Sequence, residues 1–171
     1  MVGARLATIL FGTAGSGKSF LGELFESRLG MLHYELDQHL TPAMQSAISN
    51  GREFTDEMRD EYFVHIVPHI KDILKAHPRC VFTQAVYKER HRRYLVEQIP
   101  ELEPVWITAP LELIAERLMA REEGISREYA RKIQANFEPP MAGKTLVNDS
   151  EDTELLCQRF IELFPNTGVS R

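Results

Sequence analysis

One eight-residue segment, residues 12–19, constrains this chain more than any other part of it. It reads Gly-Thr-Ala-Gly-Ser-Gly-Lys-Ser and fits the pattern Gly-x-x-x-x-Gly-Lys-Ser/Thr of a phosphate-binding loop. An apolar run of strand length, residues 6–11, precedes it, and apolar residues at helical spacing follow it. Strand, glycine loop and helix is the setting that the motif requires. We expect the whole loop to bind nucleotide phosphates: Gly12, Thr13, Ala14, Gly15, Ser16, Gly17, Lys18 and Ser19.

Short apolar segments alternate with amphipathic ones along the rest of the chain. We expect further strands at residues 32–34, 80–83, 105–108 and 145–148. Helices are expected between them, with Pro42 opening one, Thr55 capping a long one, and Pro68 kinking or breaking that one near Val64. The others are expected at 87–98, after Pro110, from Ser126 through Phe137, and at 155–163. This alternation predicts a three-layer α/β/α domain spanning residues 1–171, with a five-stranded parallel sheet.

Composition and charge argue against two kinds of partner, nucleic acid and membrane. The chain has 171 residues and a net charge of −5, which makes nucleic acid an unlikely partner. Cys80 and Cys157 are its only cysteines, and we expect two reduced thiols in the core of a cytoplasmic protein. No apolar run approaches the length that a membrane span needs, so we expect no membrane partner.

Residues that directly follow the strands carry the expected chemistry, because ligands of such sheets lie at the carboxyl ends of the strands. Glu35 and Asp37 follow the second strand. A kinase needs one carboxylate to accept the proton of the substrate hydroxyl, the role we expect for Asp37. Gln84 follows the third strand, where many phosphate-loop enzymes have an aspartate that binds Mg²⁺. The metal ligands predicted here are therefore Ser19 and Glu35.

Several basic residues are candidates for binding anions. Arg52 and Arg59 flank Thr55, and either can make a two-point contact with a carboxylate or phosphate of the substrate. Lys88 begins the densest basic cluster, which continues through Arg90, Arg92 and Arg93. Such a run is usually a solvated face. Because it starts at a strand end, we expect one or two of its members, Lys88 first, to face the substrate.

A pair of arginines predicts a lid. Arg117 and Arg121 lie one helical turn apart, and a polar segment with Gly124 follows them. We expect a lid at about residues 121–138, with Arg117 over the adenine and Arg121 reaching the transferring phosphoryl group. An Arg/Glu surface pattern is the alternative for this stretch. Of the six histidines, His65 and His69 have an i,i+4 spacing, but they lack the glutamate that a zinc hydrolase has between them, so we expect no metal site there.

These motifs together resemble the small phosphate-loop kinases of the adenylate kinase and shikimate kinase type, and among them the gluconate kinases. The resemblance rests on residues 11–19, on 35–37 followed by Thr41-Pro42, on 51–59, on 85–88, on 117–121 and on 134–139. It implies the P-loop NTPase fold with strand order 2-3-1-4-5, ATP and Mg²⁺ as cofactors, and Arg59 as the residue that holds a sugar acid. A small anionic acceptor and a monomer or homodimer are expected.

The chain departs from the gluconate kinase pattern in four places. Glu35 replaces an aspartate, Thr41 a histidine and Tyr87 a common lysine, while Gly124-Ile125 replaces a His-Phe pair. A shikimate, nucleotide or polynucleotide kinase therefore stays an alternative. So does a regulatory protein that binds ATP with a degenerate acceptor site. A GTPase switch is not favoured, because the chain has no Asn-Lys-x-Asp motif for guanine.

Overall fold

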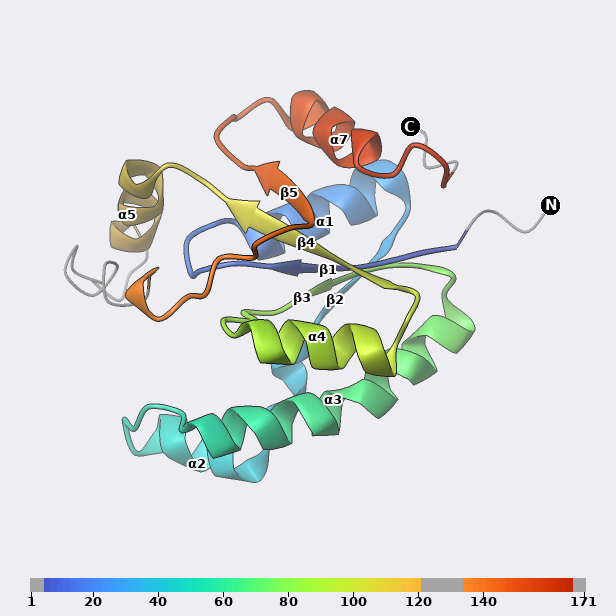
Figure 1. Cartoon of the computed structure of the whole chain (residues 1–171). Coiled ribbons are helices and arrows are strands. Elements are labelled where there is room, and N and C mark those ends of the chain that lie inside the picture. The colour runs from blue at the N-terminus through green and yellow to red at the C-terminus, as the bar shows by residue number, and fades with distance from the viewer. Residues whose placement is uncertain (1–4, 121–133, 168–171) are drawn as a thin grey trace.

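A five-stranded parallel sheet forms the centre of the computed structural model, which describes residues 5–120 and 134–167 (Figure 1). Its strands lie in the order β2-β3-β1-β4-β5, and every pair of neighbours is parallel. The predicted fold class and strand order are therefore confirmed. The strand bounds are β1 Leu6–Phe11, β2 Leu32–Glu35, β3 Arg79–Thr83, β4 Leu102–Thr108 and β5 Lys144–Val147.

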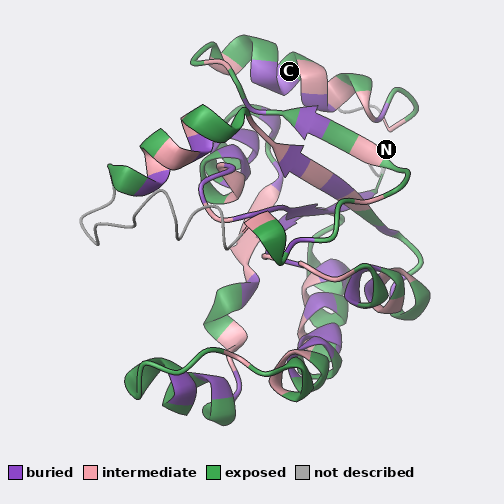
Figure 2. Ribbon diagram, turned by 60° about the vertical axis from the view of Figure 1, so that its left-hand side comes forward, coloured by how far each residue is buried: buried purple, intermediate pink, exposed green. Residues whose placement is uncertain are grey.

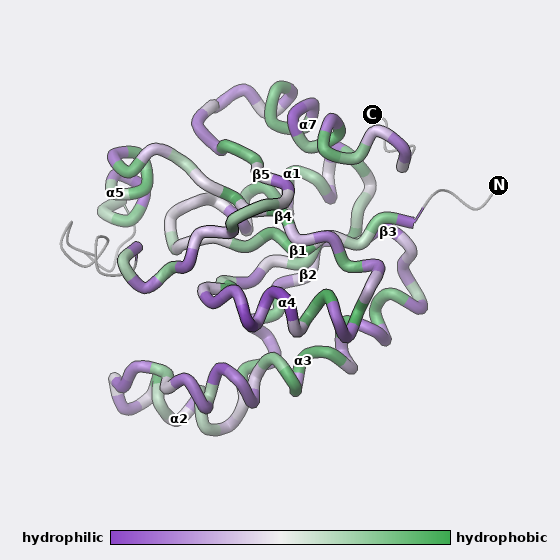
Figure 3. Tube along the Cα trace, viewed as in Figure 1, coloured by the Kyte–Doolittle hydropathy of each residue, from purple (hydrophilic) through white to green (hydrophobic). Residues whose placement is uncertain are grey.

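Helices cover both faces of the sheet and complete the three layers. On one face lie α1 (Lys18–Leu29) and α7 (Thr153–Glu162), with Phe25 and Phe160 stacked 4.1 Å apart between them. On the other face lie α3 (Asp56–Ala76) and α4 (Glu89–Gln98). Strands β1 and β3 are almost fully buried, and Figure 2 shows that the outer faces of the helices are exposed. Figure 3 shows the hydrophobic colour along β1. Both cysteines are buried and free, as expected of core thiols.

The remaining elements lie toward the carboxyl ends of the strands. They are the 3-10 helix η1 (Leu36–His39), α2 (Pro42–Ser49) and α5 (Leu111–Met119). The predicted starts of two helices, α2 at Pro42 and α3 after Thr55, are confirmed. The Thr41 hydroxyl accepts from the Met44 N–H at 3.3 Å, and the Thr55 hydroxyl accepts from the Met58 N–H at 3.2 Å. Thr41 thus has a capping role where the gluconate kinase pattern has a histidine.

Pro68 was expected to kink or break the long helix near Val64, and the break is absent, because α3 runs unbroken from Asp56 to Ala76. Pro68 removes one helical hydrogen bond, to the carbonyl of Val64. Both residues lie on the exposed side of the helix, and Val64 is 58% exposed, so water can replace the lost bond. Burial of Phe63, Ile66 and Ile70 on the opposite side holds the helix together.

Other predicted bounds shift by a few residues. The helix after β3 begins at Glu89 rather than at 87. Strand β4 begins at Leu102 and includes Pro104. A strand tolerates proline where one of its sides has no neighbouring strand. Pro104 meets this condition, because β5 pairs with β4 only from Val105 onward. Of the helix expected from Ser126 through Phe137, the described part is helical at residues 134–135. Phe137 lies after this helix, in coil, and is buried. In the described part, no helix is long and apolar enough to cross a membrane.

Candidate nucleotide and acceptor site

The phosphate-binding loop joins β1 to α1 in a conformation that depends on its glycines. Gly12 and Gly17 have φ angles of 152° and 92°. A Cβ on Gly12 would lie 2.3 Å from the Ile107 carbonyl oxygen, and one on Gly17 would lie 2.1 Å from the Asn148 amide nitrogen. Neither position accepts a side chain without displacing its neighbour. The two glycines therefore let the loop pack tightly against the ends of β4 and β5.

The start of α1 carries the positive charge that an anion site needs. Lys18 lies in its first turn, and the ammonium donates to the carbonyls of Gly12 and Thr13, 3.0 Å away in each case. Among the described residues no side chain caps this helix, and its first turn holds no acid. The free N–H groups and the positive end of the helix dipole therefore act together with Lys18 at the loop.

Two residues far along the chain hold the loop from the other side. Arg117 of α5 donates to the carbonyls of Gly15 and Ser16 at 3.5 and 3.4 Å, and to that of Asn148 at 3.1 Å. The buried Asn148 amide donates to the Ser16 carbonyl at 2.8 Å. Partial burial lowers the pKa of Arg117, but a guanidinium stays protonated at neutral pH. The structure thus places Arg117 beside the loop, where a contact with the adenine stays a prediction.

Asp37 lies in η1, directly after β2, and is held there by a buried glutamine. The Gln84 side-chain amide donates to Asp37 Oδ1 at 3.0 Å and makes a second, short hydrogen bond to the Tyr62 hydroxyl. The backbone N–H of Gln84 donates to the Leu10 carbonyl of β1 at 3.2 Å, two residues before the loop. The structure therefore connects the predicted catalytic carboxylate to the strand that carries the phosphate-binding loop.

The predicted magnesium ligands fit an ion that arrives with the nucleotide. Ser19 is exposed in the first turn of α1, and Glu35 is half-buried at the end of β2. In the sheet, Glu35 pairs with Thr83, which pairs with Leu10, so Glu35 lies two strand spacings, or roughly 10 Å, from β1. Mg²⁺ is commonly held by one or two protein oxygens, substrate phosphates and water. Within the described residues no cluster of three or more acidic, histidine or cysteine ligands exists.

Of the two predicted substrate arginines, Arg52 lies between α2 and α3 and Arg59 lies within α3. Arg59, in the first turn of α3, donates to the Phe54 carbonyl in a short hydrogen bond, and its guanidinium lies 6.0 Å from the centre of the Phe54 ring. Its side chain is 30% exposed, so part of the guanidinium remains open to a ligand. Arg52 is exposed in the loop before Phe54. Substrate binding by either residue stays a prediction.

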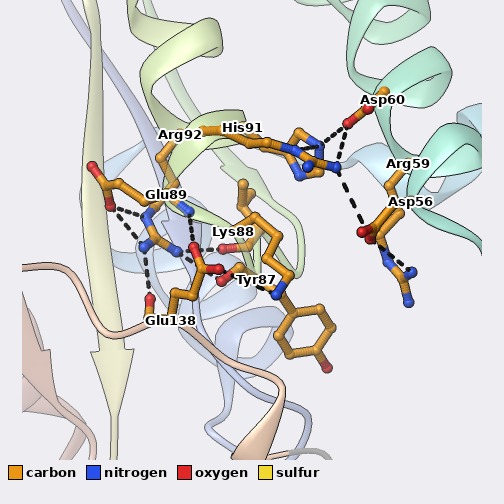
Figure 4. Close-up of polar contacts among 11 residues, drawn as sticks. Asp56, Arg59, Asp60, Tyr87, Lys88, Glu89, His91, Arg92 and Glu138 are labelled. Carbon is orange, nitrogen blue, oxygen red and sulfur yellow. Dashed lines mark hydrogen bonds and ion pairs between the residues drawn. The ribbon is translucent and has the colours of Figure 1, made fainter.

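The basic cluster after β3 is mostly engaged in ion pairs (Figure 4). Lys88 pairs with Glu138 at 3.2 Å, and Figure 4 shows the Tyr87 ring pointing away from this pair. Arg92 is turned inward: its side chain is 5% exposed and donates to Glu89 and to the carbonyls of Val86, Tyr87 and Glu138. Its guanidinium also lies 4.9 Å from the centre of the Phe11 ring. Arg92 therefore ties the segment after β3 to residues 137–138.

Two parts of the predicted site lie outside the described residues: Arg121 and the lid from 121 to 133. Sequence reasoning also missed functions for residues that the structure brings to the site. The sequence predicts Asn148 only as the last residue of a strand and Gln84 only as the residue in place of an aspartate, and it predicts no role for Tyr62. Their positions at strand ends were the available signal for Gln84 and Asn148, whereas nothing in the local sequence marks Tyr62.

The sheet order and the glycine loop define a domain of the P-loop NTPase fold. The chain matches the model of a family described as an AAA domain over residues 8–140, and it belongs to that family. A shikimate kinase of Rhizobium leguminosarum bv. trifolii is 30% identical over 116 residues, which are 67% of this chain. The match spans 57% of that relative's length.

Solved structures with the same fold include two sugar kinases. A gluconokinase from Sinorhizobium meliloti 1021 aligns with a TM-score of 0.77 at 20% identity, covering 96% of this chain and 95% of its own. A sugar kinase from Janibacter sp. HTCC2649 aligns with a TM-score of 0.78 at 20% identity, covering 98% and 99%. An APS kinase from Mycobacterium tuberculosis, in complex with AMPPNP and APS, aligns with a TM-score of 0.64 at 19% identity, covering 95% and 99%. The predicted resemblance to small phosphate-loop kinases is thereby confirmed.

Proposed function

We propose that this chain transfers the γ-phosphoryl group of ATP to a hydroxyl of a small anionic metabolite, with a sugar acid such as gluconate as the first candidate acceptor. The observation that carries the proposal is the connection between Asp37 and the phosphate-binding loop. Through Gln84, the Asp37 carboxylate is tied to β1 just before Gly12. A proton acceptor and a phosphate site on one edge of one sheet are the two parts that phosphoryl transfer to an alcohol requires.

In this proposal each residue has a separate role. Lys18 and the first-turn N–H groups of α1 bind the β- and γ-phosphates and offset the charge that develops on transfer. Mg²⁺, when bound with ATP, neutralises phosphate charge, and Ser19 and Glu35 are the residues that hold it. Asp37 orients the acceptor hydroxyl and accepts its proton. Arg59, with Arg52 and Lys88, binds the anionic group of the acceptor.

The gluconokinase and sugar kinase folds support a sugar acid as the acceptor. Shikimate is the second candidate, because the Rhizobium relative is a shikimate kinase. Both acceptors carry a carboxylate, so an arginine such as Arg59 suits either one. The APS kinase, which aligns at a lower TM-score of 0.64, keeps a nucleotide acceptor as a further candidate, whereas a polynucleotide acceptor lacks such support. A regulatory protein that binds ATP without transferring its phosphate is the alternative of another class.

A screen of ATP consumption tests the proposal. Purified protein, ATP and Mg²⁺ are mixed with gluconate, other sugar acids, shikimate or nucleoside monophosphates, and ADP is measured by a coupled assay. We expect one carboxylate-bearing acceptor to stimulate ADP formation. Asp37→Asn should then lower kcat by a factor of about 10² to 10⁴.

Asp72→Asn is the matched control, since Asp72 is an exposed residue of α3 that pairs with Lys75. It should leave kcat within about twofold of the wild type, as expected of an exposed ion pair. ADP formation that no acceptor stimulates would contradict the kinase proposal and favour the regulatory alternative. A neutral acceptor would contradict the anionic acceptor and the roles of Arg59, Arg52 and Lys88, but not the kinase activity.

A further inference from the structure

Gln84 and Tyr62 form a buried hydrogen-bond chain behind the predicted catalytic carboxylate. Gln84 is 6% exposed and Tyr62 is 2% exposed. The Gln84 amide donates one hydrogen to Asp37 Oδ1 at 3.0 Å and the other to the Tyr62 hydroxyl. Tyr62 in turn donates to the Leu36 carbonyl at 2.8 Å. The chain therefore holds η1 at two adjacent points, the backbone of Leu36 and the side chain of Asp37.

Every polar group of the Gln84 side chain has a partner. Its two amide hydrogens are used as described, and its carbonyl oxygen accepts from the Ala85 N–H at 2.6 Å. The amide is thus fixed in one orientation, with its donor end toward Asp37. Burial, together with the nearby Asp37 carboxylate, raises the pKa of Tyr62. The phenol therefore stays protonated and remains the donor to Leu36.

A glutamine suits this place better than the aspartate that many phosphate-loop enzymes have after this strand. A carboxylate at position 84 would face the carboxylate of Asp37 and repel it. The neutral amide instead donates to Asp37, and it adds no charge near the predicted acceptor. Asp37 itself is exposed on its other side, so without these bonds its side chain would be free to change rotamer.

We infer that Gln84, held by Tyr62, is a positioning residue that fixes the Asp37 carboxylate for proton acceptance from the substrate hydroxyl. The inference rests on the proposed kinase function for its catalytic part. The structural part of the inference is that Gln84 and Tyr62 hold Asp37 and η1 in place, and this part does not depend on which acceptor is used. Gln84 acts through Asp37 and touches neither ATP nor acceptor.

The test uses Gln84→Met, which keeps the length of the side chain and removes both donors. We expect kcat to fall about tenfold or more, while KM for ATP and for the acceptor changes less than about threefold. In an Asp37→Asn background the same substitution should cost less than about threefold, because the group it positions is already gone. Gln98→Met, at the exposed end of α4, is the matched control and should match the wild type.

Tyr62→Phe is a second variant, and it removes only the hydroxyl that links Gln84 to Leu36. We expect a smaller loss in kcat than with Gln84→Met, again with both KM values kept. Tyr94→Phe, a half-buried tyrosine of α4, is its control. A kcat that falls equally in the wild-type and Asp37→Asn backgrounds would overturn the positioning role, because the effect would then not pass through Asp37.

Amide hydrogen exchange of residues 36–39 gives a readout that needs no enzyme activity. Faster exchange there in Gln84→Met and Tyr62→Phe, but not in either control, supports the structural part of the inference. Unchanged exchange would overturn it, whatever the kinetics. If the wild type phosphorylates no acceptor, the proposed function fails, and the exchange result still decides whether Gln84 holds Asp37.

Discussion

Replacing Arg92 by methionine should destabilise the protein far more than replacing its neighbour Arg93. The Arg92 guanidinium is almost fully buried and donates to Glu89 Oε2 at 2.9 and 2.7 Å, to the Val86 carbonyl at 2.8 Å and to the Glu138 carbonyl at 2.6 Å. A methionine side chain has a similar length, but it has no hydrogen-bond donor for any of these oxygens. The Val86 carbonyl, whose bond is buried, and the Glu138 carbonyl, whose bond is partly buried, then lose this donor.

The size of the effect follows from these contacts. A hydrogen bond from a charged donor contributes about 1.5–3 kcal/mol, but neighbouring bonds are not additive. Glu89 is 51% exposed and is rehydrated when Arg92 is removed, so the main loss is at the carbonyls. Leaving a buried carbonyl without its donor costs about 1–3 kcal/mol. For a chain of this size that free energy lowers Tm by about 2–12 °C.

Urea unfolding followed by circular dichroism measures the free energy of unfolding, and scanning calorimetry measures Tm. Arg93→Met is the matched control, because Arg93 is 72% exposed and lies 3.7 Å from Glu97 in a surface pair. It should change the free energy of unfolding by less than about 0.5 kcal/mol. A loss below about 1 kcal/mol in Arg92→Met, or equal losses in the two variants, would refute the anchoring role of Arg92.

Three further predictions concern the loop, the acceptor and pH. Gly17→Ala should weaken ATP binding about tenfold by calorimetry without unfolding the protein, because its Cβ would lie 2.1 Å from the Asn148 amide; unchanged affinity would show that the loop adapts freely. Arg59→Ala should raise KM for an anionic acceptor about 10- to 150-fold and leave ATP affinity unchanged; an unchanged acceptor KM would count against its role. Burial lowers the pKa of His91 from its ordinary 6.5, although its hydrogen bond to Asp60 acts in the opposite direction. The unfolded chain therefore binds more protons below that pH, and the free energy of unfolding should fall as pH drops below 6.5. His91→Gln should reduce this fall in urea titrations on either side of pH 6.5, and an undiminished fall would assign it to other groups.

Local patterns were sufficient to predict the sheet and the helix starts. The strand-loop-helix at residues 6–29, the helix start at Pro42 and the cap at Thr55 depend on neighbours within a few residues, and the structure has them as predicted. The break expected at Pro68 is absent because that expectation weighed one lost hydrogen bond without the buried side of α3. Packing against the sheet is a tertiary effect that the local sequence does not encode.

The site was predictable at the glycine loop and at the strand ends. Lys18 was identified from the loop motif and Asp37 from its position after a strand, although their roles remain predictions. The partner of Asp37 lies 47 residues away at Gln84, and no spacing in the sequence indicates such a pairing. Arg92 belonged to a run of basic residues that is typical of a solvated surface, yet it is buried beneath residues 137–138. Burial of a charged side chain depends on which segments cover it, so it could not be predicted from composition.

Phosphoryl transfer by Lys18→Ala, compared with the wild type, tests the central claim most directly. Mass spectrometry of the acceptor should detect its phosphorylated form with wild-type protein, ATP and Mg²⁺, and none with Lys18→Ala. Circular dichroism and thermal unfolding should be the same for both proteins, because Lys18 contacts the loop carbonyls and adds little to the core. Normal turnover by a well-folded Lys18→Ala protein would contradict the assignment of residues 12–19 as the phosphate site of a kinase.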